Sequence, residues 1–205
     1  MSFFKSIFEK PWNYQGEDPN LSGTEIGESL HPKRIALRMF LGVVFVVFML
    51  FIVAYFIRME LEDWRPMPES DTLWINTGLL FICSVIMQWT RASIAKGLNK
   101  SVKFGMIASG VITLAFVYGQ LSAWEEMNNA GYYLASNPAN SFFYVLTGIH
   151  GMHILGGLWV WTQATFKILS GAEIKTVRLS VELCSVYWHF LLLVWLVIFA
   201  LLSYT

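Results

Sequence analysis

Charge is scarce in this sequence, and neither sign is in excess. Only 14% of the 205 residues are Asp, Glu, Lys or Arg, and the formal net charge is zero. Proteins that bind nucleic acid carry a field of basic residues on one surface. We therefore expect no nucleic-acid partner.

Cysteine is scarce as well, and Cys83 and Cys184 are the only two. Each lies inside an apolar run, which indicates thiols packed in a core and argues against a disulfide framework or a zinc site. The sequence also shows no nucleotide-binding glycine loop and no Ser/His/Asp arrangement. We therefore predict that the chain holds no catalytic residue of its own.

Apolar residues, in contrast, are abundant. Hydrophobic residues make up 56% of the chain and aromatic residues 16%, which is too much for an ordinary soluble domain. A membrane-spanning helix needs about 20 mostly apolar residues. The segments that meet this requirement are Met39–Ile57, Leu73–Trp89, Phe104–Trp124, Phe142–Phe166 and Leu183–Tyr204. We predict an all-α, polytopic membrane protein that consists of a bundle of five transmembrane helices.

Basic residues are unevenly distributed over the connecting segments. The N-terminal segment and the second and fourth connections hold Lys5, Lys10, Lys33, Arg34, Arg38, Arg91, Lys96, Lys100, Lys103, Lys167, Lys175 and Arg178. The first connection has Arg58 and Arg65 among several acids, and the third connection and the C-terminus have no basic residue. Cytoplasmic loops carry the excess of Lys and Arg, so we predict that the N-terminus lies inside and the C-terminus outside.

Reporter fusions at Ser2 and Thr205 test this orientation. We expect the Ser2 fusion to report the cytoplasm and the Thr205 fusion the opposite side, because the basic residues gather on the segments predicted to lie inside. Fusions that report the reverse would contradict the topology.

Two parts are predicted along the chain. Residues 1–34 form a cytoplasmic tail, and residues 35–205 form the five-helix transmembrane domain. In the tail, Phe3, Phe4, Ile7 and Phe8 fall on one helical face before Pro11. This pattern fits a short helix lying on the inner leaflet, and it fits equally well a tail that becomes ordered only against a partner.

Histidines occur inside two of the predicted spans. "FFYVLTGIHGMH", from Phe142 to His153, contains His150 and His153, which share one helical face. In the last span, Glu182 and His189 also share a face, because they are seven residues apart. The helix rise places His153 and His189 at similar depth, so a contact between the fourth and fifth helices is predicted.

An imidazole in hydrocarbon needs a partner, and three interpretations of these histidines are open. They form hydrogen bonds that tie helices together, or His150, His153 and His189 ligate haem or a metal. In the third interpretation they bind a lipid headgroup or line a proton path. The spans lack the converging carboxylates that a non-haem iron or copper site would use.

Four strings of the sequence match the motifs of one known family. "NSFFYVLTGIHGMHILGG" (Asn140–Gly157) and "VELCSVYWHFLLLVWLVIF" (Val181–Phe199) resemble the two C-terminal helices of subunit III of haem-copper respiratory oxidases. "LWINTGLLFICSVIMQW" resembles its Leu-x-Asn-Thr helix, and "GQLSAW" (Gly119–Trp124) the Gln-containing end of the next helix. The resemblance runs from about Ile35 to Thr205.

The resemblance implies an accessory, cofactor-free subunit of a proton-pumping terminal oxidase that reduces oxygen to water in the bacterial inner membrane. The implied partners are catalytic subunit I, which holds the haems and copper, subunit II, and further respiratory-chain complexes. The family's subunit stabilises the catalytic subunit, binds phospholipid in a cleft and supports proton uptake. By position, the residues that would form its buried polar network or touch lipid are His150, His153, Glu182, Trp188 and His189.

The sequence departs from the family in two ways. Larger members have seven helices, whereas this chain has five, as in bacterial forms without the first two. Many members also carry a carboxylate in the helix that matches Met39–Ile57, and this segment has none. A proton-antenna role that depends on that acid therefore has no basis here.

Other identities fit the same strings. A quinol oxidase would use a similar third subunit, and so would an accessory protein of nitric oxide reductase. The electron donor is selected by another subunit, so this chain does not reveal it. An alternative of a different class is a stand-alone membrane protein that binds haem or a metal through two histidines.

Overall fold

A computed structural model of the protein describes residues 32–66, 71–171 and 174–204. The interfacial helix expected around Phe3–Phe8 lies outside these residues and stays a prediction. The chain divides into two units, Met1–Phe40 and Leu41–Thr205, and packing is described within the second.

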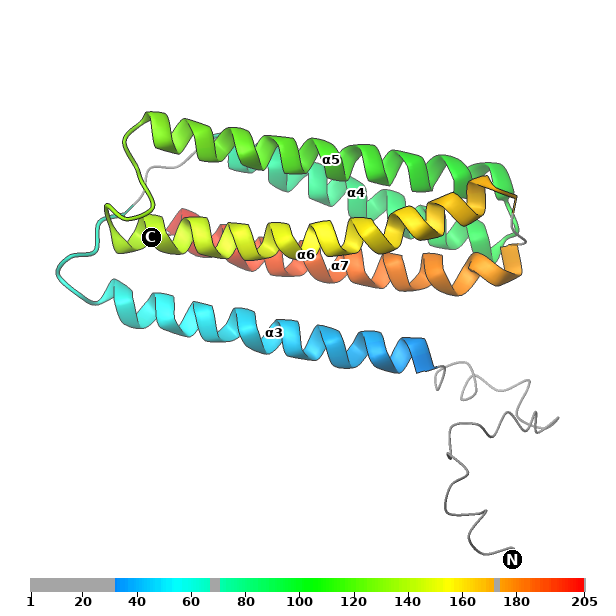
Figure 1. The fold of residues 1–205 in the computed structure, drawn as a ribbon, viewed down its shortest axis with the longest axis horizontal. Helices are drawn as coiled ribbons and strands as arrows, with labels where there is room; N and C mark the ends of the chain where they lie inside the picture. Colours follow the sequence, from blue (N-terminus) through cyan, green and yellow to red (C-terminus); the bar gives the residue numbers. More distant parts are fainter. Residues whose placement is uncertain (1–31, 67–70, 172–173, 205) are drawn as a thin grey trace, which may run out of the picture. The chain divides into compact units, whose positions relative to one another are not determined.

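The described part of the chain is built from five helices (Figure 1). They are α3 (Pro32–Met59), α4 (Asp71–Ala95), α5 (Asn99–Asn129), α6 (Pro138–Leu169) and α7 (Ile174–Tyr204). All five are long and apolar enough to cross a membrane, and the described ranges contain no strand. This confirms the prediction of an all-α, multi-pass membrane protein with five spans, while the side on which each terminus lies stays a prediction.

The helices begin and end at recognisable signals. Asn137, in an extended conformation, precedes α6 and accepts a hydrogen bond from the Ala139 amide at 3.3 Å, with Pro138 at the first helical position. Glycines with positive φ, between 72° and 87°, follow the ends of α4, α5 and α6 at Gly97, Gly131 and Gly171. Only glycine adopts this conformation without strain, so the same residue type closes all three helices.

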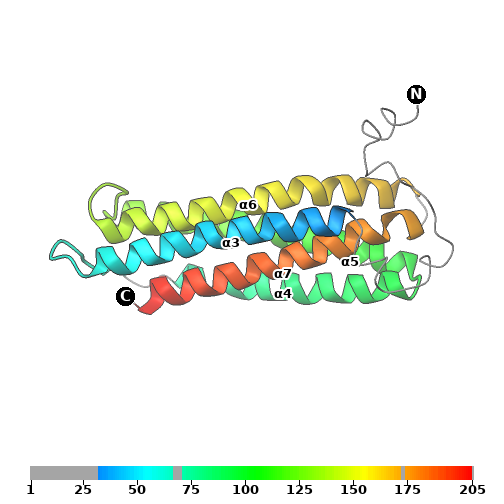
Figure 2. The same ribbon diagram turned by 90° about the horizontal axis from the view of Figure 1, so that it is seen from below.

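Helices α4 to α7 pack as an antiparallel bundle. Helix α4 contacts α5 and α7, and α6 contacts α7 and α5; Figure 2 shows α7 between α6 and α4. Helix α3 joins them through side chains. Val44, Phe48 and Tyr55 belong to one buried cluster with residues of α6 and α7, namely Leu146, Val194, Ile198 and Leu201.

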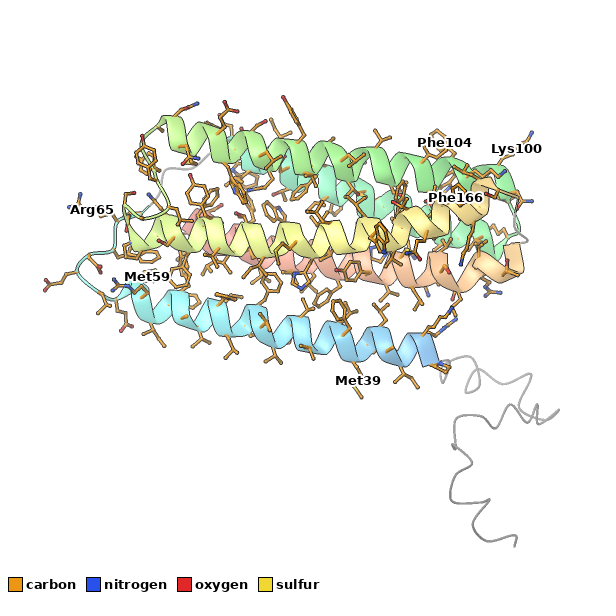
Figure 3. The ribbon with its side chains drawn as sticks, viewed as in Figure 1. Met39, Met59, Arg65, Lys100, Phe104 and Phe166 are labelled. Atoms are coloured by element: carbon orange, nitrogen blue, oxygen red, sulfur yellow. The ribbon has the colours of Figure 1, made fainter. Side chains whose placement is uncertain are left out.

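The two ends of the bundle differ in charge. We call the end with Arg91, Lys96, Lys100, Lys103 and Lys167 the basic end, and Figure 3 marks it by Lys100, Phe104 and Phe166. The opposite end, where Figure 3 labels Met59 and Arg65, is the acidic end and carries Glu60, Glu62, Asp63, Asp71, Glu125 and Glu126.

Glycines allow close approach where helices cross. A Cβ atom on Gly105 would collide with Thr90, and one on Gly119 would collide with Asn76, which explains how closely α4 lies against α5. Small residues let helix backbones approach each other in lipid, where burial of apolar surface gives no driving force.

Candidate functional site

His189 joins α7 to α4. Its Nδ1 shares a hydrogen bond with Ser84 Oγ at 2.5 Å, and its Nε2 lies 3.1 Å from Gln88 Oε1 and 3.3 Å from Ser185 Oγ. An amide oxygen only accepts hydrogen bonds, so Nε2 carries the proton and the Ser84 hydroxyl donates to Nδ1. The hydrogen bonds that His189 makes to another helix therefore run to α4. The predicted contact between the fourth and fifth spans, α6 and α7, is present, but the hydrogen bonds of His189 do not form it.

The tie between α6 and α7 at this level is made by Tyr187. Its hydroxyl donates to the backbone oxygen of His153 at 2.8 Å. The Nδ1 atom of His153 bonds to the Ile149 carbonyl of its own helix, also at 2.8 Å. Gly157, one turn further along α6, leaves space for the ring of Tyr187, because a Cβ there would lie 2.5 Å from Tyr187 Cε1.

His150 is completely buried, with 0% of its surface exposed. Its ring lies among those of Phe48, Phe116 and Trp195, with centroids 6.5, 6.1 and 5.1 Å away. Within the described residues, neither of its ring nitrogens has a hydrogen-bond partner. It is therefore surrounded by aromatic rings from three helices and takes no part in the hydrogen bonds of His189.

Trp188 is one of four tryptophans whose indole N–H donates a hydrogen bond to a hydroxyl on another helix; we call these bonds indole ties. The sequence did not suggest them. The Nε1 atom of Trp188 donates to Thr113 Oγ1 of α5 at 3.0 Å. Three other indoles also bond to a hydroxyl on another helix, and the pairs are Trp124 with Thr147, Trp161 with Ser109 and Trp195 with Thr77. These four bonds connect α5 to α6, α5 to α7 and α4 to α7.

The two motif fragments on α4 and α5 meet in the structure. Asn76, in "LWINT", donates to Gln120 of "GQLSAW" at 3.3 Å. Further along the same helix pair, Cys83 Sγ lies 3.4 Å from the Ser109 carbonyl and 3.3 Å from Thr113 Oγ1. The buried thiol predicted at Cys83 therefore lies in the α4–α5 interface.

Glu182 lies on the face of α7 that carries His189, nearer the basic end. It pairs with Arg178 one turn earlier at 2.9 Å, and its side chain is 13% exposed. Within the described residues, no group of three His, Cys, Asp or Glu side chains is placed to hold a metal ion.

The acidic end is held by bonds between its loops. Asn137, the cap of α6, donates to the Arg65 carbonyl and accepts from the Arg65 amide at 3.4 Å. Thr72, at the start of α4, donates to Glu126 at the end of α5 at 3.0 Å. Glu126 is thus engaged with a neighbouring helix, and Arg58 is paired with Asp63.

Comparison with known proteins gives a consistent result. The chain matches the family described as cytochrome c oxidase subunit III over residues 33–205. A protein of Synechocystis sp. named cytochrome c oxidase subunit 3 is 33% identical over 193 residues, which cover 87% of this chain and 79% of that protein.

More distant relatives carry the same name. Cytochrome c oxidase subunit 3 of Thermostichus vulcanus is 26% identical over 69% of this chain and 71% of its own length. That of Gallus gallus is 26% identical over 66% of this chain, which corresponds to 51% of the chicken protein. The chain belongs to the cytochrome c oxidase subunit III family and is an accessory subunit of a haem-copper oxidase.

Proposed function

We propose that this chain stabilises the catalytic subunit of a proton-pumping terminal oxidase, without holding a cofactor itself. Its partners are subunit I, with the haems and copper, and subunit II; it binds phospholipid and supports proton uptake. The proposed location is the bacterial inner membrane. The proposed electron donor is cytochrome c, because the relatives are named as subunits of cytochrome c oxidase.

The observation that carries the proposal is that polar side chains form hydrogen bonds between the helices. His189, Trp188 and Tyr187 each bond to a different neighbouring helix, α4, α5 and α6. Hydrogen bonds of this kind hold helices in register in a membrane. A rigid bundle built in this way suits a subunit that supports another chain.

His153 supports the phospholipid part of the proposal. It is half-buried on α6, and its ring lies 5.6 Å from that of Phe48 on α3. Helix α3 presents apolar side chains outward on its other faces, such as Val53, 55% exposed, and Phe56, 50% exposed. A polar group partly open beside an apolar face is typical of a place where a lipid lies against a protein.

The replacement His189→Leu tests the accessory role in the purified complex. We expect the haem spectrum to remain unchanged while subunit retention or sustained turnover falls, because the bonds to Ser84 and Gln88 are lost. Interhelical hydrogen bonds in membranes contribute about 0.6 kcal/mol on average and up to roughly 2, so the fold should loosen and not collapse. The measurements are the haem spectrum, the subunit content and oxygen consumption over many turnovers.

His189→Gln is the matched variant, because an amide can donate and accept as imidazole does, and it should restore part of the loss. Disappearance of a haem signal at full subunit content would make His189 a ligand and end the accessory proposal. Unchanged retention and turnover would show that the α4–α7 tie has no bearing on the complex.

A further inference from the structure

A stripe of polar residues on α4 continues past His189 towards the basic end. Thr77, Ser84 and Gln88 all bond to residues of α7. Arg91 follows Ser84 by seven residues and Gln88 by three, so it falls on the same face of the helix. Arg91 is also the only cation within α4.

Within the part of the chain that the structure describes, the two amide hydrogens of Gln88 make no hydrogen bond. Its Oε1 faces His189, so its amide nitrogen points away from that bond, and the side chain is exposed. Within a spanning helix, amide hydrogens need an acceptor, because hydrocarbon offers none. Arg91 is exposed as well, and a guanidinium forms strong hydrogen bonds with a phosphate group.

The pair is surrounded by exposed apolar and aromatic side chains. Val85, 55% exposed, and Ile82, 50% exposed, continue from Gln88 towards the middle of the bundle. Trp89 is 46% exposed and lies edge-on to Phe104 at 6.4 Å, and Figure 3 shows Phe104 at the basic end. Exposed aromatic side chains of this kind are enriched at membrane–water interfaces. Gln88 lies about 4–5 Å deeper than Arg91 along the helix.

We propose that Gln88 and Arg91 bind the phosphate of a phospholipid in the leaflet at the basic end. A phosphodiester offers two anionic oxygens, one for the guanidinium and one for the amide hydrogens. An acyl chain then runs along Val85, one turn from Gln88. This deepens the proposed lipid binding by naming a site on the α4–α7 face, away from His153, and the chain can fail this test and still be an oxidase subunit.

Lipid titration of the tagged full-length protein in non-ionic detergent tests the site. The probes are dioleoylphosphatidylglycerol, dioleoylglycerol, which lacks the phosphate, and inorganic phosphate, with bound lipid counted by native mass spectrometry. The variants are Arg91→Gln and Gln88→Leu. Lys100→Gln is the matched control, since it removes one positive charge from the same end but from α5.

We expect Arg91→Gln and Gln88→Leu each to weaken binding of the phosphatidylglycerol by about tenfold, as the loss of a charge-assisted hydrogen bond implies, and Lys100→Gln to change it less than about twofold. Unchanged elution profiles and thermal midpoints show that the variants fold.

Equal losses in Arg91→Gln and Lys100→Gln would show only diffuse charge attraction and overturn the site. Equal binding of dioleoylglycerol would exclude phosphate recognition, and competition by inorganic phosphate alone would mean a site for free phosphate. Unchanged binding of phosphatidylglycerol in both Arg91→Gln and Gln88→Leu would overturn the site.

Discussion

Gly157→Ala is expected to lower the thermal stability of the protein, while Gly156→Ala beside it is not. A Cβ on Gly157 would lie 2.5 Å from Tyr187 Cε1 and 3.0 Å from Tyr187 Cδ1, whereas one on Gly156 meets nothing within 4 Å. The ring of Tyr187 is rigid, and its hydroxyl is bonded to the His153 carbonyl. It can move away only by breaking that bond between α6 and α7.

The gain in helix propensity is the same for Gly157→Ala and Gly156→Ala. Both place alanine in the interior of α6, where it is favoured over glycine by about 1 kcal/mol. Overpacking costs about 1–3 kcal/mol and falls on Gly157→Ala alone. By the scaling of soluble domains of this length, the two thermal midpoints should differ by about 2–12 °C. Thermal denaturation of the detergent-solubilised protein measures this, and equal midpoints would mean that α6 and α7 are not in close contact at Tyr187.

The number of spans followed from the sequence because membrane crossing depends on local composition. Each apolar run needed only its own residues to be recognised, and all five became helices. Their ends were less predictable. Helix α7 begins at Ile174, well before the apolar run at Leu183, because a helix continues through polar turns outside the hydrocarbon.

The partners of the histidines depended on something that local composition does not contain, namely the order of the helices in space. The face shared by Glu182 and His189 was evident from their spacing, but α7 contacts both α4 and α6. The spacing alone does not tell which neighbour that face meets. The signal that was available is on α4, where Ser84 and Gln88 are four residues apart and place two polar groups on one face.

The indole ties were missed for a related reason. A tryptophan in a spanning segment has an apolar body and one donor, so by itself it indicates only bulk and depth. Its meaning comes from a hydroxyl on another helix, such as Thr113 for Trp188 or Thr77 for Trp195. Four such pairs in one bundle show that Ser and Thr within spans deserve to be considered together with Trp when helix contacts are predicted.

Neither the sequence nor the packing explains why a histidine is buried at position 150. A buried polar group without a partner costs about 1–3 kcal/mol. Both ring nitrogens of His150 are in this position among the described residues, and its neighbour on α3 is Phe48, itself 1% exposed. Helix α3 contains no Asp or Glu. The imidazole thus faces an aromatic ring from a helix that has no carboxylate to offer.

The loss of stability caused by Phe48→Glu is therefore expected to depend on whether His150 is present. A carboxylate at this position arises beside both imidazoles, because Phe48 contacts the rings of His150 and His153. The new carboxylate can accept a hydrogen bond from His150. Among the described residues His150 makes no other hydrogen bond that this new one would replace. In a His150→Leu background the same acid has one partner fewer, and a charged side chain within a span costs about 2.5–3.5 kcal/mol or more.

A double-mutant cycle measures this dependence. His150→Leu alone should change stability by less than about 1 kcal/mol or raise it, since no hydrogen bond is removed. Phe48→Glu should cost about 0.5–3 kcal/mol more in the His150→Leu background than in the wild type, the range found for directly coupled residues. Val44→Glu is the control, because Val44 is 3% exposed in the same cluster, one turn away on α3, and its cost should not depend on His150. A Phe48→Glu penalty that is equal in both backgrounds would mean that the carboxylate and the imidazole do not meet, and that α3 is not held against α6 at His150.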